Sequence, residues 1–158
     1  RYEFMNDEKN FIYGANYQQH GYEPVFLIVD ELGAFSASGT DKSSKATIAE
    51  AMAGIKQIIL LGRQAGVFVL LAAQQMNSNV LSTEMRDNLG LRIALGSNSR
   101  EGYTMVFGPA LPDAVPPVEV KGSGLLYQQG SGEQYAQYFE SPFLDSSFDF
   151  ITELKKLI

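Results

Sequence analysis

The chain has 158 residues and a formal net charge of −6, which fits one domain with a buried core. It contains no cysteine, so disulfides, thiolate metal sites and a cysteine nucleophile are excluded. No apolar run approaches the roughly 20 residues of a membrane span, and no signal peptide is visible. The acidic balance argues against a monomer that binds nucleic acid through a broad basic patch, although it leaves local loop contacts open.

The first half of the chain predicts a strand, a helix and a second strand. Residues 1–10 are polar and helix-compatible, and residues 11–24 indicate turns. The apolar run VFLIVD at 25–30 lacks alternation, so we expect a strand buried on both faces. Residues 36–45 indicate a polar loop, and 46–66 a long helix that stops at Gly66. A buried strand at 67–73 then completes a right-handed parallel crossover.

The second half predicts shorter elements. Ser82 is a fair N-cap for a helix over 82–90, and Gly108 and Pro109 end a helix that starts near Ser99. We expect a third short strand at 91–96, a hairpin over 122–140 and a final amphipathic helix with four apolar residues turned inward: Phe148, Ile151, Leu154 and Ile158. The expected fold class is therefore α/β, with helices flanking a sheet of parallel strands and a C-terminal hairpin and helix.

Two adjacent carboxylates, Asp30 and Glu31, follow the first apolar strand. Ligands of parallel α/β sheets bind at the carboxyl ends of the strands. An Asp there can hold Mg²⁺ directly or through water, and the following Glu can deprotonate a water aimed at a γ-phosphate. The alternative is a strand that simply ends in a polar loop; several aliphatic residues before the acidic pair favour a nucleotide site.

Three further side chains suit the same chemistry. Gln74 follows the second strand, so it should lie near Asp30, where a neutral amide can bond a phosphate oxygen and the attacking water. Arg63, near the end of the long helix, and Arg92, which opens the third strand, could act as an arginine finger toward a neighbouring subunit. A strand-capping Gln and solvated arginines explain the same residues without any function.

The phosphate-binding loop G-x-x-x-x-G-K-[ST] does not occur in the sequence. The stretch SGTDKSS at 38–44 contains Gly39, Lys42 and Ser43, but the lysine does not follow the glycine directly. Residues 38–44 are better explained as a flexible loop. Because Arg1 is not a methionine, and the first residues resemble the middle of a helix, we expect this chain to be a fragment of a longer protein.

Several of these segments occur in the order and spacing of a known family. VFLIVDELGAF, LGRQAGVFVLLAAQQ, RDNLGLRIALG, GSGLLYQQG and YFESPFL together resemble the second half of an FtsK/SpoIIIE-type motor domain, in particular the FtsK-like coupling ATPases of Gram-positive conjugative elements. The resemblance covers about residues 22–158. It implies that residues 1–158 are the C-terminal part of a single RecA-like domain whose upstream P-loop part is absent.

The resemblance assigns roles to single residues. Asp30 and Glu31 match the Walker B acidic pair, Gln74 matches the sensor glutamine, and Arg63 and Arg92 match arginines that act as trans fingers in different relatives. The family often has Arg-Pro after the sensor glutamine, where this chain has Gln75 and Met76. ATP and Mg²⁺ are the implied cofactors, and both need the upstream P-loop. The fragment alone is therefore expected to be inactive.

The family also implies partners. Its members form rings, expected here to be hexamers, and move double-stranded DNA through a pore; conjugative relatives deliver DNA with a relaxase to a membrane channel. Candidate DNA contacts are Lys42 and Lys45, together with Asn77 and Ser78, although ordinary solvated loops explain them equally well. The implied location is cytoplasmic, with the full-length protein anchored to the membrane through a region outside this chain. Two alternatives are a protein-moving ring ATPase of the type VII secretion kind and a non-catalytic assembly module.

Overall fold

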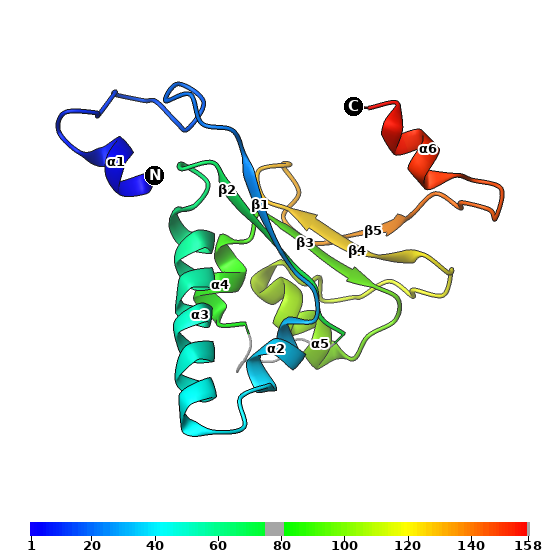
Figure 1. Cartoon of the computed structure of the whole chain (residues 1–158). Coiled ribbons are helices and arrows are strands. Elements are labelled where there is room, and N and C mark those ends of the chain that lie inside the picture. Colours follow the sequence, from blue (N-terminus) through cyan, green and yellow to red (C-terminus); the bar gives the residue numbers. More distant parts are fainter. Residues whose placement is uncertain (75–80, 158) are drawn as a thin grey trace.

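The computed structural model describes residues 1–74 and 81–157. Two parallel strands, β1 (Val25–Val29) and β2 (Val67–Leu71), pair in register from Val25 opposite Val67 to Val29 opposite Leu71. Helices α2 (Leu32–Ala37) and α3 (Lys42–Leu61) connect them (Figure 1), because parallel neighbours need a long crossover. The predicted strand, helix and strand are therefore confirmed.

All helices that pack on this pair cover the same face. The core residues Leu32, Ile55, Ile59, Leu81 and Met85 come from α2, α3 and the region of α4 (Thr83–Asn88), and they contact the inward side chains Leu27, Val29, Val69 and Leu71. On the opposite face, Phe26 and Ile28 are each 66% exposed. The prediction that both faces are covered is wrong for the described residues, because α2, α3 and α4 share one side.

The start and end of α3 differ from the prediction. The segment 36–45 is not a single loop, because α2 extends to Ala37 and α3 begins at Lys42. Asp41 caps α3: its side chain accepts hydrogen bonds from the amides of Ser43 and Ser44. The small polar residues that suggested a loop thus form an N-cap.

Helix α3 also ends before the predicted stop. It ends at Leu61 with Gly62 as C-cap, whereas Gly66 lies in the following turn with a φ of 70°. A Cβ atom at Gly66 would lie 2.4 Å from the ring of Tyr17. Gly66 is therefore needed to let the loop of Tyr17 pack against the turn before β2, not to stop the helix.

A second sheet contains β3 (Leu91–Leu95), β4 (Ser123–Gln128) and β5 (Gln137–Glu140), in that order and antiparallel. The predicted hairpin is confirmed as β4 and β5, and β3 pairs with this hairpin instead of extending the β1–β2 pair. Helix α5 (Arg100–Phe107) and the short 3₁₀ turn η1 (Gly108–Ala110) pack on the sheet. Its core consists of Ala94, Tyr103, Phe107, Leu125 and Ala136.

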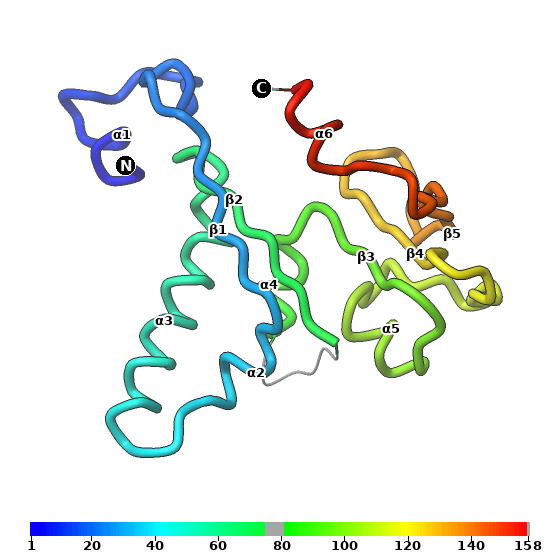
Figure 2. The backbone as a smooth tube through the Cα atoms, turned by 45° about the vertical axis from the view of Figure 1, so that its right-hand side comes forward, coloured from blue at the N-terminus to red at the C-terminus, as the bar shows by residue number. Residues whose placement is uncertain are grey.

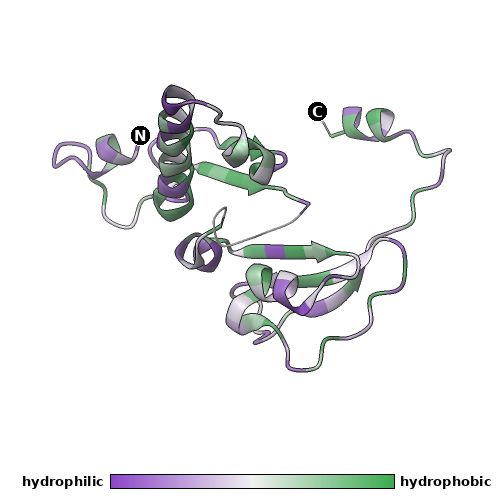
Figure 3. Ribbon diagram, turned by 90° about the horizontal axis from the view of Figure 1, so that it is seen from below, coloured by the Kyte–Doolittle hydropathy of each residue, from purple (hydrophilic) through white to green (hydrophobic). Residues whose placement is uncertain are grey.

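The outer surface of β3 is apolar and uncovered, like that of β1. Leu91, Ile93 and Leu95 are exposed, while the alternate residues Arg92 and Ala94 face the second core. Figure 3 shows the β1–β2 pair largely in the colour of hydrophobic residues and the three-stranded sheet in mixed colours. Among the described residues, the β1–β2 pair therefore buries one face only, and β3 likewise, whereas the central strand β4 has three consecutive buried residues, Ser123, Gly124 and Leu125.

The two ends of the chain add little to these cores. Helix α1 (Tyr2–Asn6) buries Met5, whereas α6 (Phe150–Lys155) buries no residue and stands apart from both sheets (Figure 2). The predicted inward orientation of Phe148, Ile151 and Leu154 is wrong, since all three are exposed; Ile158 lies outside the described residues. Among the described residues, no helix has the length and apolar character that crossing a membrane requires.

Candidate functional site

The candidate site is the edge where β1 and β2 both end. Asp30 and Glu31 follow β1 directly, Gln74 comes shortly after β2, and the last paired residues are Val29 and Leu71. The parallel arrangement therefore brings the acidic pair and Gln74 to one edge, as ligand sites of such sheets require. Asp30 and Gln74 are exposed there, and Glu31 is half-buried.

Glu31 has an unusual backbone. Its φ of 56° and ψ of 60° lie in the left-handed region, and it is the single non-glycine with positive φ among residues 1–74 and 81–157. For any residue with a Cβ atom this conformation is unfavourable in free energy, and it often occurs at functional positions. Glu31 is also the N-cap of α2, but its carboxylate does not bond the α2 amides.

The carboxylate of Glu31 instead contacts the end of β2. The main-chain amide of Gln74 donates a hydrogen bond of 3.2 Å to Oε2 of Glu31. This contact joins residues 43 positions apart and involves the backbone of Gln74, which sequence reasoning about its side chain does not reveal. No hydrogen bond to the other carboxylate oxygen is formed by residues 1–74 or 81–157.

The metal-binding capacity of this edge is small. Within the described residues no group of three or more His, Cys, Asp or Glu side chains could hold a metal. Magnesium is the hard cation that suits such a poor donor set, because it binds through one or two carboxylates and completes its shell with water and phosphate oxygens. Asp30 fits that role on its chemistry and exposure.

Arg63 lies at the other edge of the β1–β2 pair. It follows α3 and precedes β2, so it is beside the amino ends of the strands, not on the carboxyl edge that holds Asp30. Arg63 is exposed and lines a pocket of about 420 Å³ together with Tyr2, Tyr17, Leu60, Leu61, Phe68, Asn16 and Gln64. This position separates Arg63 from the acidic pair of its own chain.

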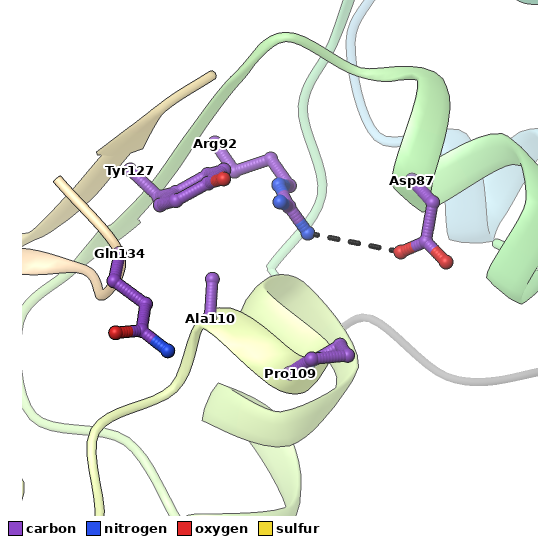
Figure 4. A pocket seen from close by; sticks show the side chains of 6 residues that line it. All are labelled: Asp87, Arg92, Pro109, Ala110, Tyr127 and Gln134. Carbon is purple, nitrogen blue, oxygen red and sulfur yellow. Dashed lines mark ion pairs between the residues drawn. The ribbon is translucent and has the colours of Figure 1, made fainter. Parts of the chain in front are cut away.

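Arg92 is held inside the second sheet. Its side chain is only 9% exposed, and Nη1 donates to the carbonyl of Phe107 at 3.0 Å, at the C-terminal end of α5. The guanidinium lies over the ring of Tyr127, 4.5 Å from its centroid, and 3.9 Å from Asp87 (Figure 4). Burial lowers the pKa of Arg92, an effect that Tyr127 and Asp87 oppose. Arg92 therefore joins β3, β4 and α5.

Sequence reasoning missed the partners of Arg92. Arg86 is also buried and donates through Nε to Asp87 at 2.8 Å, and this bond holds the pKa of Asp87 below its usual range. A Cβ atom at Gly108 would lie 2.5 Å from the Arg86 guanidinium carbon. The pairing of Arg92 with Tyr127 across the two strands could have been predicted only with the register in hand.

The candidate DNA-contact residues divide into two groups. Lys42 and Lys45 are exposed in the first turn of α3, which follows α2 along the chain. Asn77 and Ser78 lie outside the described residues. The structure thus presents two of the four candidates on the surface.

The fold and this edge define a class of protein: α/β domains in which an acidic pair lies at the carboxyl edge of parallel strands. No protein-family model matches the chain. The chain is 33% identical over its whole length to the FtsK domain-containing protein YdcQ of Bacillus subtilis (strain 168). It spans 31% of the length of that relative. The predicted relationship to FtsK-type domains is therefore confirmed.

Two solved structures share the fold. The pCW3 conjugation coupling protein TcpA, solved as a monomer with ATPγS, matches 89% of this chain with a TM-score of 0.66 and 19% identity. The cytoplasmic domain of the Thermomonospora curvata type VII secretion ATPase EccC matches 93% with a TM-score of 0.59 and 25% identity. The chain covers 38% and 16% of these structures, respectively. The α/β fold class is confirmed; one neighbour was solved with ATPγS, and the other is described as an ATPase.

Proposed function

We propose that this chain is the C-terminal part of the motor domain of an ATP-driven translocase of double-stranded DNA. One observation carries the proposal: the parallel pairing of β1 and β2 places Asp30, Glu31 and Gln74 at one exposed edge. An acidic pair beside a neutral amide is what phosphoryl transfer to water needs there. The likeness to YdcQ over the whole chain supports the assignment.

Each residue of the edge has a distinct proposed role. Asp30 holds Mg²⁺ through water, Glu31 takes the proton of the attacking water, and the Gln74 side chain bonds that water or a phosphate oxygen. Magnesium, when bound with ATP, neutralises charge on the phosphates. The phosphate-binding loop is proposed to come from residues outside this chain, and the uncovered apolar faces of β1 and β3 support such a missing part.

Arg63 is our proposed trans finger. It is exposed and lies at the edge opposite Glu31, so only a neighbouring subunit can bring it to a nucleotide at Glu31. A head-to-tail contact of this kind generates a ring when its rotation closes, and we propose a closed hexamer. Arg92 is the weaker candidate, because its guanidinium is committed to Phe107, Tyr127 and Asp87.

Subunit mixing tests this choice in the full-length protein. Arg63→Ala and Glu31→Gln should each lower ATP turnover, Arg63→Ala by on the order of 10³-fold. An equimolar mixture should recover activity, because some interfaces then combine an intact Glu31 with an intact Arg63. Arg92→Ala should lower the stability of the fold. If the mixture does not regain ATP turnover, or if Arg63→Ala alone is fully active, Arg63 is excluded as a trans finger.

DNA and protein partners complete the proposal. Lys42 and Lys45 are proposed to contact phosphates, together with Asn77 and Ser78, and a relaxase and membrane channel proteins are proposed partners in DNA transfer. We place the full-length protein at the cytoplasmic face of a membrane, anchored by residues outside this chain. The structural likeness to the conjugation coupling protein TcpA is consistent with this setting.

The direct test is DNA-stimulated hydrolysis of ATP by the full-length protein. Glu31→Gln should reduce turnover by roughly 10²-fold or more, whereas the matched control Glu50→Gln, on the exposed surface of α3, should not. The 158-residue chain alone should show no Mg²⁺-dependent turnover. Unchanged hydrolysis in Glu31→Gln would refute the assignment of the base.

A ring ATPase that moves protein is the second candidate, and the likeness to the type VII secretion ATPase EccC favours it. The same edge chemistry would serve both functions. Double-stranded DNA should raise the turnover of a DNA translocase and leave that of a protein-moving ATPase unchanged. No turnover with either cargo would indicate an assembly module.

A further inference from the structure

The hydrogen-bond ladder between β1 and β2 contains an extra residue where it ends. The amide of Val25 donates to Gly66, and the amide of Ala72 donates to Val29, which keeps a regular parallel register along the pair. A regular ladder would next use the amide of residue 31 to reach the carbonyl of Ala72. The amide of Leu32 makes that bond instead, at 3.0 Å, so β1 ends in a one-residue bulge.

This bulge keeps the carboxylate of Glu31 out of the core. Side chains alternate along a strand, and Leu27 and Val29 face the core, so a regular continuation would turn residue 31 inward as well. The extra residue lets Leu32 take that place, where it is fully buried. Because Glu31 is the extra residue, it adopts the left-handed conformation. Its side chain is thereby directed to the end of β2.

At the end of β2 the carboxylate meets a fixed donor. The amide of Gln74 bonds Oε2 of Glu31 at 3.2 Å, and a main-chain donor cannot rotate away as a side chain can. A carboxylate offers about four acceptor positions, so one such bond orients the group, and no other described residue bonds Oε1. The same bond also ties the loop after β1 to the loop after β2.

We propose that the main-chain amide of Gln74 is the positioning group for the Glu31 carboxylate, a role distinct from any role of the Gln74 side chain. This inference rests on the proposed function of Glu31 as the base. The bulge supplies the direction of the side chain, and the amide fixes the plane of the carboxylate. Glu31 then presents Oε1 to the attacking water. As the water oxygen bonds to the γ-phosphorus and the bond from that phosphorus to the ADP oxygen breaks, the proton of the water moves to Oε1.

The test replaces Gln74 in the full-length protein by its α-hydroxy acid analogue, which keeps the side chain and exchanges the N–H for an ester oxygen. We expect kcat for ATP hydrolysis to fall about tenfold, the order of one charge-assisted hydrogen bond, with KM for ATP unchanged. In the Glu31→Gln background the same replacement should cause no further loss, because the base is already absent. An unchanged kcat, or an equal loss in both backgrounds, would overturn the proposal.

A second measurement does not depend on catalysis or on the ester variant. Hydrogen exchange of the Gln74 amide, followed by NMR in the 158-residue chain, should be about tenfold faster in Glu31→Ala than in the wild type. Glu50→Ala is the matched control and should leave the rate unchanged. Equal exchange in Glu31→Ala and wild type would refute the positioning contact. Unchanged hydrolysis in Glu31→Gln would instead refute only the proposed base, so the two failures are distinguishable.

Discussion

The left-handed backbone at Glu31 predicts an inverted order of stability for two substitutions. Glu31→Ala and Glu31→Gly both remove the carboxylate that bonds Gln74, so they differ in the backbone term. At φ 56° and ψ 60° an L-residue with a Cβ atom loses roughly 1–2 kcal/mol. Glycine avoids this loss but gives up roughly 0.5–1 kcal/mol of additional chain entropy on folding. We expect Glu31→Gly to be the more stable variant by about 0.5–1 kcal/mol.

Urea unfolding of the two variants measures this difference, with the free energy of unfolding taken from midpoints at a common m-value. The matched control is Ala49→Gly on the exposed surface of α3, where glycine should cost about 1 kcal/mol relative to alanine. The sign should therefore reverse between the two positions. An alanine variant at Glu31 that equals or exceeds the glycine variant would refute the left-handed assignment and the bulge that depends on it.

Three further predictions concern the packing and the caps. Phe107 is fully buried, so Phe107→Ala should cost about 3–5 kcal/mol in urea unfolding; a loss under 1 kcal/mol would contradict its place in the core. A Cβ atom at Gly124 would lie 2.2 Å from a carbonyl oxygen of β3, so Gly124→Ala should destabilise the fold far more than Gly90→Ala, where no atom lies within 4 Å. Hydrogen bonds from Ser44 and Ser43 lower the pKa of Asp41 from 3.8. The charged cap therefore contributes its full stabilisation to the fold above pH 3.8, and this contribution is lost as the pH falls through the lowered pKa. The urea midpoints of wild type and Asp41→Ala should converge there, and a constant gap would contradict the charged cap.

Local sequence rules predicted most of the elements because their causes are local. The predicted N-cap Ser82 accepts an amide hydrogen bond as expected, α5 starts beside Ser99 as predicted, and Gly108 ends it with a φ of 55°. The hairpin of β4 and β5 follows from two short strands around glycines. The same rules failed where one composition fits two structures: Asp41 and its serines suit a loop as well as a helix cap.

The failures of the face predictions have a different cause. The apolar run of β1 predicts that both faces are buried, yet Phe26 is 66% exposed. An apolar strand sequence indicates that the strand is buried, but it does not reveal which segment buries it. The same holds for α6, whose apolar residues find no partner among the described residues. These exposed apolar residues support the proposal that further segments cover the faces of β1 and α6.

For the acidic pair, the sequence predicts which residues lie together, but only the structure shows the backbone conformation of Glu31. Strand ends and parallel pairing placed Asp30, Glu31 and Gln74 together from pattern alone, because the carboxyl ends of parallel neighbours share an edge. The bulge could be recognised only from the hydrogen bonds of Leu32 and Ala72. Residues 25–31 contain no glycine, which is the usual sign of a left-handed backbone in a sequence. Glu31 adopts this conformation although it lacks the backbone freedom of glycine. This indicates that the contribution of its carboxylate exceeds the free-energy cost of the strained backbone. Residue identity and strained geometry therefore independently support the proposal that Glu31 acts in the chemistry of this edge.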